Sequence, residues 1–373
     1  MKGNDCLGII FSNTHDELLR ELTWLRATGS MPFGGRYRLI DFSLSNLVNA
    51  GVSRVGVITK SNYQSLMDHL GSGKPWNLAR KKDGLFILPP YGRDSAVLYT
   101  GKIQGLTGIM GFLDHSIQKT VIMCDADVIS NLDLEKVLDA HEANQADITV
   151  VYRHCESEMK GMDDIVNMTM DETGRVREIK ITSAASKEGN YALDIVVISK
   201  ALLVELITDA AARNLKDFCR DILQRNVVSL KIYGFKAEGY TAVIDSMSSY
   251  LNANMDLLRS DVRRSLFPNN RPVYTKSRDD CPAKYGLSAD VKNSLIADGC
   301  QIEGQVENSI LFRGVKIGKG SVVKNSIILQ DSIVEDVSSL AWVITDKDVT
   351  VGSGRTLNGS DSYPVFIAKG AII

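Results

Sequence analysis

The residues around Gly34 and Gly35 have types that could bind a phosphate or another anion. The segment reads MPFGGRYRLIDFSLSN, and Arg26, Arg36 and Arg38 surround its Gly-Gly turn. Guanidinium groups pair well with phosphate oxygens, although arginines on a protein surface are more often simply solvated. A Gly-Gly turn before a helix is also typical of an ordinary tight loop. The pattern therefore indicates either an anion site or a plain turn lined by surface arginines.

A second candidate is the carboxylate pair Asp125 and Asp127, which follows the apolar run Val121 to Cys124. Proteins usually hold Mg²⁺ with one or two carboxylates. The alternative is a solvated strand end. The pair is therefore a candidate metal site, and Mg²⁺ is expected only if the chain is catalytic.

The scaffold of these residues is predicted from hydrophobic patterns. The first part of the chain alternates β-rich runs with helical patterns, which is typical of a mainly parallel sheet covered by helices. Strands are predicted at Leu7–Phe11, Val55–Thr59, Val121–Cys124, Asp147–Tyr152 and Asp194–Ile198. Helices are predicted at Phe42–Asn49, Val97–Leu113 and around Tyr250–Arg259. The sequence thus predicts an α/β domain.

The last part of the chain has a period of six. Apolar residues recur at Leu311, Ile317, Val323 and Leu329, with glycines in the turns between them. This period suits a β-helix whose coils stack aliphatic side chains, and the alternative is a β-sandwich with coincidental spacing. We expect domains at residues 1–262 and 286–373, joined by a proline-containing linker at 263–285.

Composition excludes several classes of protein. The formal net charge of −2, without a basic stripe, argues against nucleic-acid partners and polybasic membrane contacts. No apolar stretch approaches the roughly 20 residues of a membrane span, and MKGNDC is not followed by the apolar segment of a secretion signal. The six cysteines lack zinc or CxxC spacing, which favours free thiols. We expect a cytoplasmic protein.

The run PFGGRYRLIDFSLSN closely resembles the PFGGKYRLIDFxLSN segment of glucose-1-phosphate adenylyltransferases, or ADP-glucose pyrophosphorylases. That family makes ADP-glucose and diphosphate from ATP and glucose 1-phosphate. The resemblance implies a doubly wound nucleotidyltransferase-like (Rossmann-like) domain followed by a left-handed parallel β-helix. Both halves of the chain fit this architecture.

The phosphate loop departs from that family. Active members resemble LAGGxGTRLxxLTxxRAKPA, which aligns without gaps to the segment ending at Ser30, but here the loop reads SNTHDEL. Its glycines are replaced by residues that include Asn13 and Asp16, Leu18 replaces the arginine, and Thr28 replaces the lysine. Asp16, like its neighbour Glu17, would repel a phosphate. Leucines at helical spacing, at positions 18, 19, 22 and 25, predict a short packed helix instead.

The metal and sugar sites show similar departures. Asp127 falls on the family's metal aspartate, but the second one, in YWRDVGT, aligns with Val243; Asp245 takes its place only after a two-residue slip. The family's FVEKP lysine aligns with Thr182, and the serine of SMGIYVF with Ala192. The glycine of the latter motif becomes an aspartate, Asp194. The KDFCRD run resembles HDFGKD and is interpreted as structural.

These departures favour a non-catalytic or weakly catalytic regulatory subunit, similar to the GlgD-type proteins of bacterial glycogen biosynthesis. The resemblance implies a hetero-tetramer with a catalytic glucose-1-phosphate adenylyltransferase and a sugar-phosphate or nucleotide effector near Arg38. An active enzyme that uses Asp127 and Asp245, and a sugar-phosphate sensor without a partner, remain alternatives. A hexapeptide acyltransferase is disfavoured, because all five histidines precede the β-helix.

Overall fold

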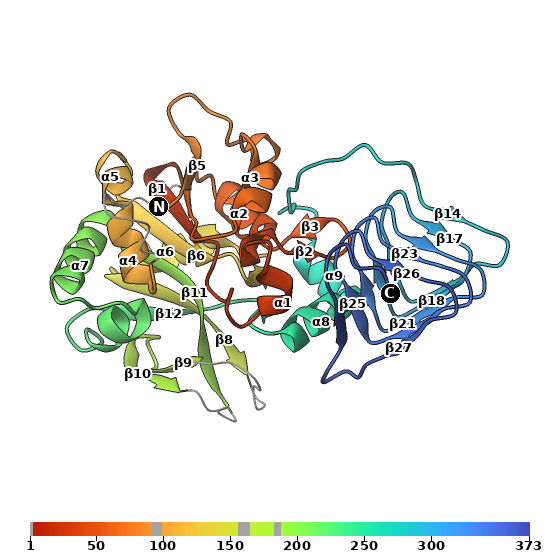
Figure 1. The fold of residues 1–373 in the computed structure, drawn as a ribbon. Helices are drawn as coiled ribbons and strands as arrows, with labels where there is room; N and C mark the ends of the chain where they lie inside the picture. Colours follow the sequence, from red (N-terminus) through yellow and green to blue (C-terminus); the bar gives the residue numbers. More distant parts are fainter. Residues whose placement is uncertain (1–2, 91–98, 156–164, 183–187) are drawn as a thin grey trace.

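The computed structural model describes residues 3–90, 99–155, 165–182 and 188–373, and it has two parts (Figure 1). The N-terminal part is built on a nine-stranded sheet in the order β10-β9-β11-β6-β1-β4-β5, with β8 beside β11 and β12 beside β8. Its strands are β1 (Cys6–Phe11), β4 (Arg54–Ile58), β5 (Gly84–Leu88), β6 (Thr120–Asp125), β8 (Ile148–Cys155), β9 (Ile165–Met170), β10 (Val176–Thr182), β11 (Gly189–Ser199) and β12 (Ile232–Lys236). All five predicted strands are present.

The direction of the strands changes across this sheet. β6, β1, β4 and β5 are parallel, whereas β11 runs antiparallel to β6, β8 and β9. Because β8 and β9 are both antiparallel to β11, they run in the same direction as β6, and β12 is parallel to β8. Only β11 and β10 run the opposite way, so the prediction of a mainly parallel sheet is confirmed. The carboxyl ends of β1 and β6 meet at one edge, where Phe11 pairs with Asp125.

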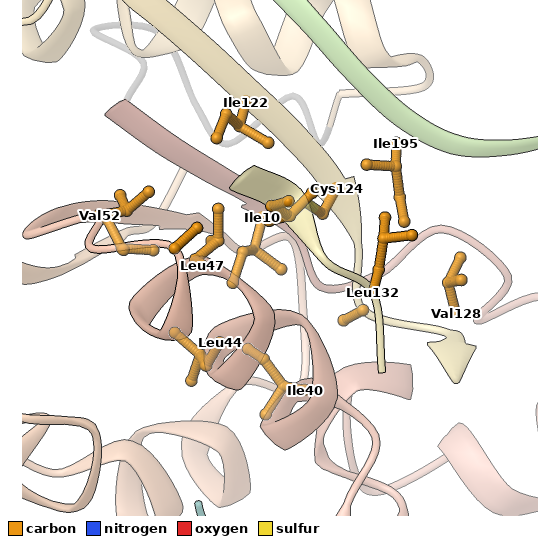
Figure 2. Packing of buried hydrophobic residues seen from close by; sticks show 14 of the residues in the cluster. Ile10, Ile40, Leu44, Leu47, Val52, Ile122, Cys124, Val128, Leu132 and Ile195 are labelled. Atoms are coloured by element: carbon orange, nitrogen blue, oxygen red, sulfur yellow. The ribbon is translucent and has the colours of Figure 1, made fainter. Parts of the chain in front are cut away.

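Helices cover both faces of the sheet, as a doubly wound fold requires. One face carries α2 (Ile40–Asn49) and α6 (Leu134–Ala143), and the other carries α4 (Lys102–Gly108), α5 (Met110–Asp114) and α7 (Lys200–Ala212). Figure 2 shows how Ile40, Leu44 and Leu47 of α2 lie against Ile10 of β1. Burying such a side chain contributes roughly 1.5–3 kcal/mol. The predicted helix Val97–Leu113 is divided into α4 and α5, and residues 97–98 lie outside the described part.

The two parts are joined by a segment that hydrogen bonds attach to the first domain. α8 (Met247–Asp256) and α9 (Ser260–Leu266) precede it, and residues 267–283 form no regular element. Ser45 Oγ accepts the N–H of Tyr274 at 2.9 Å, and Asn49 Nδ2 donates to the Pro272 carbonyl at 3.1 Å. α2 therefore holds the segment against the first domain. The irregular stretch is shorter at both ends than the linker predicted at 263–285.

The C-terminal part consists of three five-stranded parallel sheets wound into a left-handed β-helix. The first contains β14 (Lys284–Tyr285), β17 (Gln301–Ile302), β20 (Lys316–Ile317), β23 (Ile333–Val334) and β26 (Thr350–Val351). The second contains β15 (Asp290–Lys292), β18 (Gln305–Glu307), β21 (Val322–Lys324), β24 (Ser339–Ala341) and β27 (Thr356–Asn358). The third contains β16 (Leu295–Ile296), β19 (Ile310–Leu311), β22 (Ile327–Ile328), β25 (Val343–Thr345) and β28 (Val365–Ile367). The β-sandwich alternative is wrong.

Apolar and serine columns hold the coils together. The four residues predicted at steps of six, Leu311, Ile317, Val323 and Leu329, are all buried. Successive coils also share serine hydrogen bonds. The Ser326 N–H donates to Ser309 Oγ at 3.1 Å and the Val343 N–H donates to Ser326 Oγ at 3.0 Å, each across 17 residues. A full coil in this region is therefore 17 residues long.

The third sheet of the β-helix packs against the first domain. Tyr250 and Leu257, at the α8 segment, share a buried cluster with Ile310, Ile327 and Ile344 of the β-helix. Figure 1 shows α8 and α9 between the two parts. Within the described ranges, no helix has the length and apolar character needed to cross a membrane.

Candidate functional site

The loop after β1 is closed by its own carboxylate. Asp16 Oδ1 accepts the Thr28 backbone N–H at 2.8 Å and the Thr28 hydroxyl at 2.6 Å, while Asn13 Nδ2 donates to Oδ2. Both oxygens of Asp16 therefore accept hydrogen bonds within the loop, and the expectation that its charge would repel a phosphate stays a prediction. Thr28 and Asn13 thus keep the loop compact in place of a ligand.

The helix predicted from the leucine spacing is shorter than expected. Turns cover residues 14–19, and α1 extends only from Arg20 to Thr23. Leu19 and Leu22 are buried, but Leu18 and Leu25 are 44% and 57% exposed. The prediction of a packed segment is therefore confirmed for two of the four leucines. The other two, Leu18 and Leu25, lie in the turns on either side of α1 and are not packed by the helix.

A pocket of about 490 Å³ opens beside this loop. It is lined by Phe11, Asn13, Thr14, His15, Leu18, Lys60, Tyr99, Thr100, Gly101, Lys102, Val166, Ile181, Asp194, Lys216, Asp217, Phe218 and Cys219. These residues come from the ends of β1 and β10, from β9 and β11, and from the start of α4. The pocket therefore lies at the carboxyl end of the central strands, where open α/β sheets commonly bind ligands.

Lys102 and two aspartates form an ion network in this pocket. Lys102 Nζ lies 2.9 Å from Asp125 Oδ2 and 2.9 Å from Asp194 Oδ1. Burial opposes the charge on Lys102, but the two carboxylates outweigh it and raise the pKa of the lysine. The same lysine lowers the pKa of Asp194 against the effect of burial, whereas burial raises the pKa of Asp125. Asp194 has a φ of +53°, a left-handed conformation that favours glycine.

Asp127, the candidate metal ligand, is paired with a histidine. His15 Nδ1 contacts Asp127 Oδ2, and only 2% of the aspartate is exposed. Burial disfavours the charged imidazole, yet the nearby carboxylates, Asp127 foremost, raise the pKa of His15 to about 9. His15 is therefore a cation at neutral pH.

Asp245 lies close to this pair through the strand register. Val243, at the end of β13 (Thr241–Val243), pairs with Val128 at the start of β7 (Val128–Ser130), and the Ile244 N–H donates to the Asp127 carbonyl at 3.0 Å. The side chain of Val243 packs against the hydrophobic cluster beneath α2. Burial raises the pKa of Asp245, and the charge on His15 opposes this rise. Both candidate carboxylates are thus within electrostatic reach of His15.

These residues do not fit a Mg²⁺ ion. One oxygen of Asp127 contacts His15, and one oxygen of Asp125 contacts Lys102. Across the described ranges, no group of three or more His, Cys, Asp or Glu side chains is arranged to hold a metal ion. Oxygens of Asp127 and Asp245 that lack a hydrogen-bond partner remain, but they do not converge into such a group.

The predicted sugar-phosphate residues lie at the edge of the pocket. Thr182 is exposed at the end of β10, and Ala192 packs against the core from β11. Neither lines the pocket, whereas their neighbours Ile181 and Asp194 do. The KDFCRD run, interpreted as structural, also contributes Phe218 and three other residues to the wall.

The three predicted arginines have different environments. Arg26 is 3% exposed, and its Nη2 donates to both oxygens of Asp346 in the β-helix, at 2.7 and 2.8 Å. Its Nη1 has no hydrogen-bond partner among the described residues. Arg38 donates to the carbonyl and the hydroxyl of Ser65 at 2.6 and 2.9 Å. Arg36 is exposed and lies over the Tyr37 ring.

A lysine from the β-helix lies near two of these arginines. Burial, followed by the positive charges of Arg38 and Arg26, lowers the pKa of Lys347 to about 7; Lys369 acts in the same direction and Asp346 opposes them. The structure therefore concentrates positive charge where the two domains meet. Arg36 lies near a different cation, since its positive charge helps to lower the pKa of the buried Arg313.

Comparison with known proteins agrees with this architecture. The sequence pattern of the family described as nucleotidyl transferase matches residues 8–260, and the pattern described as GlmU-like, C-terminal hexapeptide matches residues 281–362. The chain belongs to the nucleotidyl transferase family. Within this family it is 34% identical to the glycogen biosynthesis protein GlgD of Bacillus subtilis, over 100% of this chain and 98% of that protein.

Two further members of the family extend this comparison. The GlgD protein of Geobacillus stearothermophilus is 38% identical, over 99% of this chain and 97% of its own length. A glucose-1-phosphate adenylyltransferase of Clostridium perfringens is 30% identical, over 100% of this chain and 97% of its own length. The chain therefore belongs with the glucose-1-phosphate adenylyltransferases and GlgD proteins of this nucleotidyl transferase family.

Sequence reasoning missed three side chains of the site. His15 was recognised only as a replaced loop residue, and neither Lys102 nor Lys347 was predicted to contribute. The partner of His15 lies 112 residues away, and Arg26 and Asp346 are separated by 320 residues. Local spacing carries no signal for contacts of this range.

Proposed function

We propose that this chain is a non-catalytic or weakly catalytic regulatory subunit of glucose-1-phosphate adenylyltransferase in bacterial glycogen biosynthesis, acting in the cytoplasm. The observation that supports this most is that the chain's own side chains satisfy the groups a substrate complex would need. Asp16 accepts hydrogen bonds from Thr28 within the phosphate loop, and His15 contacts Asp127. Lys102 bridges Asp125 and Asp194. The full-length similarity to two proteins named GlgD supports the same role.

The partner in this proposal is a catalytic glucose-1-phosphate adenylyltransferase subunit, in a hetero-tetramer. A subunit that does no chemistry can still change its neighbour's rate if it binds one conformation of that neighbour more tightly than another. Similar length and fold favour such mixed assembly, because this chain aligns with 97% of an adenylyltransferase-named relative.

The effector in this proposal is a sugar phosphate or nucleotide bound near Arg26, Arg36 and Arg38. Arg26 has an unpartnered, buried guanidinium nitrogen, and the pKa of Lys347 is lowered by burial and then by the charges of Arg38 and Arg26. A phosphate group would offset the repulsion between Lys347 and the two arginines, and it would accept a hydrogen bond from Arg26 Nη1. Because Arg26 and Lys347 belong to different domains, such an effector would act on their contact.

The test is to assay the chain alone and with a catalytic partner. Alone, with ATP, glucose 1-phosphate and Mg²⁺, we expect a rate at least about 100-fold below that of a catalytic homologue, since losing one preorganised electrostatic contact already costs that much. Added to the partner, the chain should change the maximal rate and the activator response. Arg38→Gln should weaken the activator response, whereas Arg213→Gln on the exposed end of α7 should not. A rate alone that equals a catalytic homologue contradicts the proposal.

A second candidate is an active enzyme that uses Asp127 and Asp245. This candidate is favoured by the backbone hydrogen bond from Ile244 to Asp127, which brings the neighbouring Asp245 close to Asp127. It is also favoured by Asp245 Oδ2, which has no hydrogen-bond partner among the described residues. If the chain turns over alone, Asp127→Asn and Asp245→Asn should each abolish turnover. If the chain is regulatory, the Asp245 variant should still alter the partner's rate. Recovery from cells as a homo-oligomer without an adenylyltransferase would instead indicate a sugar-phosphate sensor.

A further inference from the structure

Three carboxylates pair with two basic side chains at the pocket wall: His15, Lys102 and Asp194 line the pocket, and Asp125 and Asp127 are buried beside them. Lys102 Nζ lies 2.9 Å from both Asp125 Oδ2 and Asp194 Oδ1, and His15 Nδ1 contacts Asp127 Oδ2. The cations come from the loop after β1 and the start of α4. The carboxylates come from the end of β6, the turn behind it, and β11. Four separate segments therefore converge on one ion network.

Burial makes this pairing part of the fold. Asp125 is 1% and Asp127 is 2% exposed, so water cannot compensate their charges. A buried carboxylate needs a bound cation or a charged partner nearby. Here Lys102 pairs with one oxygen of Asp125 and His15 with one oxygen of Asp127, while the Oδ1 atom of each carboxylate has no hydrogen-bond partner among the described residues.

A divalent ion would compete directly with both side chains. Mg²⁺ requires oxygens at about 2.0–2.1 Å in a near-octahedral arrangement. At Asp127 Oδ2 such an ion would have to displace the His15 ring, and at Asp125 it would lie beside the Lys102 ammonium. The described residues contain no other cluster of acidic, His and Cys side chains that could hold the ion.

We infer that this pocket supplies its own cations and does not take up Mg²⁺, because His15 and Lys102 each occupy one oxygen of a buried carboxylate and lie beside its other oxygen. The imidazole nitrogen blocks Asp127 Oδ2 in either protonation state. The inference does not depend on the proposed regulatory role, since a chain without any partner has the same ion network. A phosphate entering this pocket would meet Lys102 and His15 instead of a metal ion.

Manganese binding to the full-length chain, measured by electron paramagnetic resonance, tests this inference. The wild type should show no one-per-chain site up to about 1 mM Mn²⁺. The double variant His15→Ala/Lys102→Met should gain one site per chain, with at least tenfold tighter binding, and Mn²⁺ should raise its melting temperature. Lys60→Met is the matched control: Lys60 lines the same pocket without an ion pair to any described carboxylate, and its variant should behave as the wild type.

Two results would overturn the inference. One is a wild-type Mn²⁺ site that Asp127→Asn abolishes. The other is a double variant that binds no more Mn²⁺ than the wild type although its circular dichroism spectrum is unchanged. If the double variant fails to fold, His15→Ala alone serves, because it releases one Asp127 oxygen and leaves the Lys102 pairs intact; absence of Mn²⁺ binding there also counts against the inference. None of these measurements requires a catalytic partner, so they are independent of the regulatory proposal.

Discussion

Replacing Arg26 by alanine tests how strongly the two domains are joined. Arg26 Nη2 donates to both oxygens of Asp346, and the two side chains are only 3% and 4% exposed. Deleting one partner of a buried ion pair costs about 3–5 kcal/mol, because the other charge stays buried. Asp346 keeps the Lys347 backbone N–H at 2.7 Å. We therefore expect a loss near the lower limit, about 3 kcal/mol.

The assay is urea unfolding followed by circular dichroism and by tryptophan fluorescence, to which Trp342 at the domain contact contributes. The double variant Arg26→Met/Asp346→Leu should recover most of the lost stability, because it leaves no buried charge. Lys324→Ala is the control: its pair with Glu307 is about half exposed, so its loss should be at most about 1 kcal/mol.

A loss for Arg26→Ala no larger than that of this control would refute the reasoning. It would mean that water reaches the Arg26–Asp346 pair, or that the two domains do not remain in contact as described. A double variant as unstable as the single one would show that Arg26 acts through packing and not through its charge.

Three further predictions concern the β-helix and the cations near it. Sulfate binding, measured by calorimetry, should weaken several-fold from pH 6 to pH 8, because Lys347 has a pKa of about 7 and loses its charge as pH rises; Lys347→Met should remove this dependence. Ser326→Ala should lower the free energy of unfolding by about 1–3 kcal/mol in urea titrations, since the buried Val343 N–H loses its acceptor. Val337→Gly should raise it by up to about 1 kcal/mol, because a β-branched residue at φ +59° is strained.

Much of the fold could be predicted because its signals are local. Apolar runs of four or five residues indicated the central strands, and the period of six indicated the β-helix, since its short strands bury aliphatic side chains at regular intervals. Strand direction is not a local property. β11 contains an irregularity between Ala192 and Ile195 and runs antiparallel to its neighbours, which no apolar pattern indicates.

The features of the site that could be predicted were mainly the positions where the residues of active family members are replaced. Replacement of the loop glycines indicated that the phosphate loop is degenerate, and the structure shows Asp16 closing that loop. The hydrogen bonds from Thr28 to Asp16 were not predicted, because they depend on the folded path of the loop. Lys102 and His15 were missed for the same reason. Their charges matter through carboxylates that only tertiary structure brings near.

Keeping Asp127 is therefore weak evidence for catalysis. The Asp127 carbonyl accepts the Ile244 N–H next to the β7–β13 pair, and the Asp127 carboxylate is paired with His15. Both contacts stabilise the fold without a metal ion. A buried carboxylate without a bound metal ion must be protonated or paired with another cation. This chain has the second arrangement at Asp127, and Lys102 does the same for Asp125. An active site that had merely lost its loop would need neither side chain, so their presence favours a pocket adapted to exist without Mg²⁺.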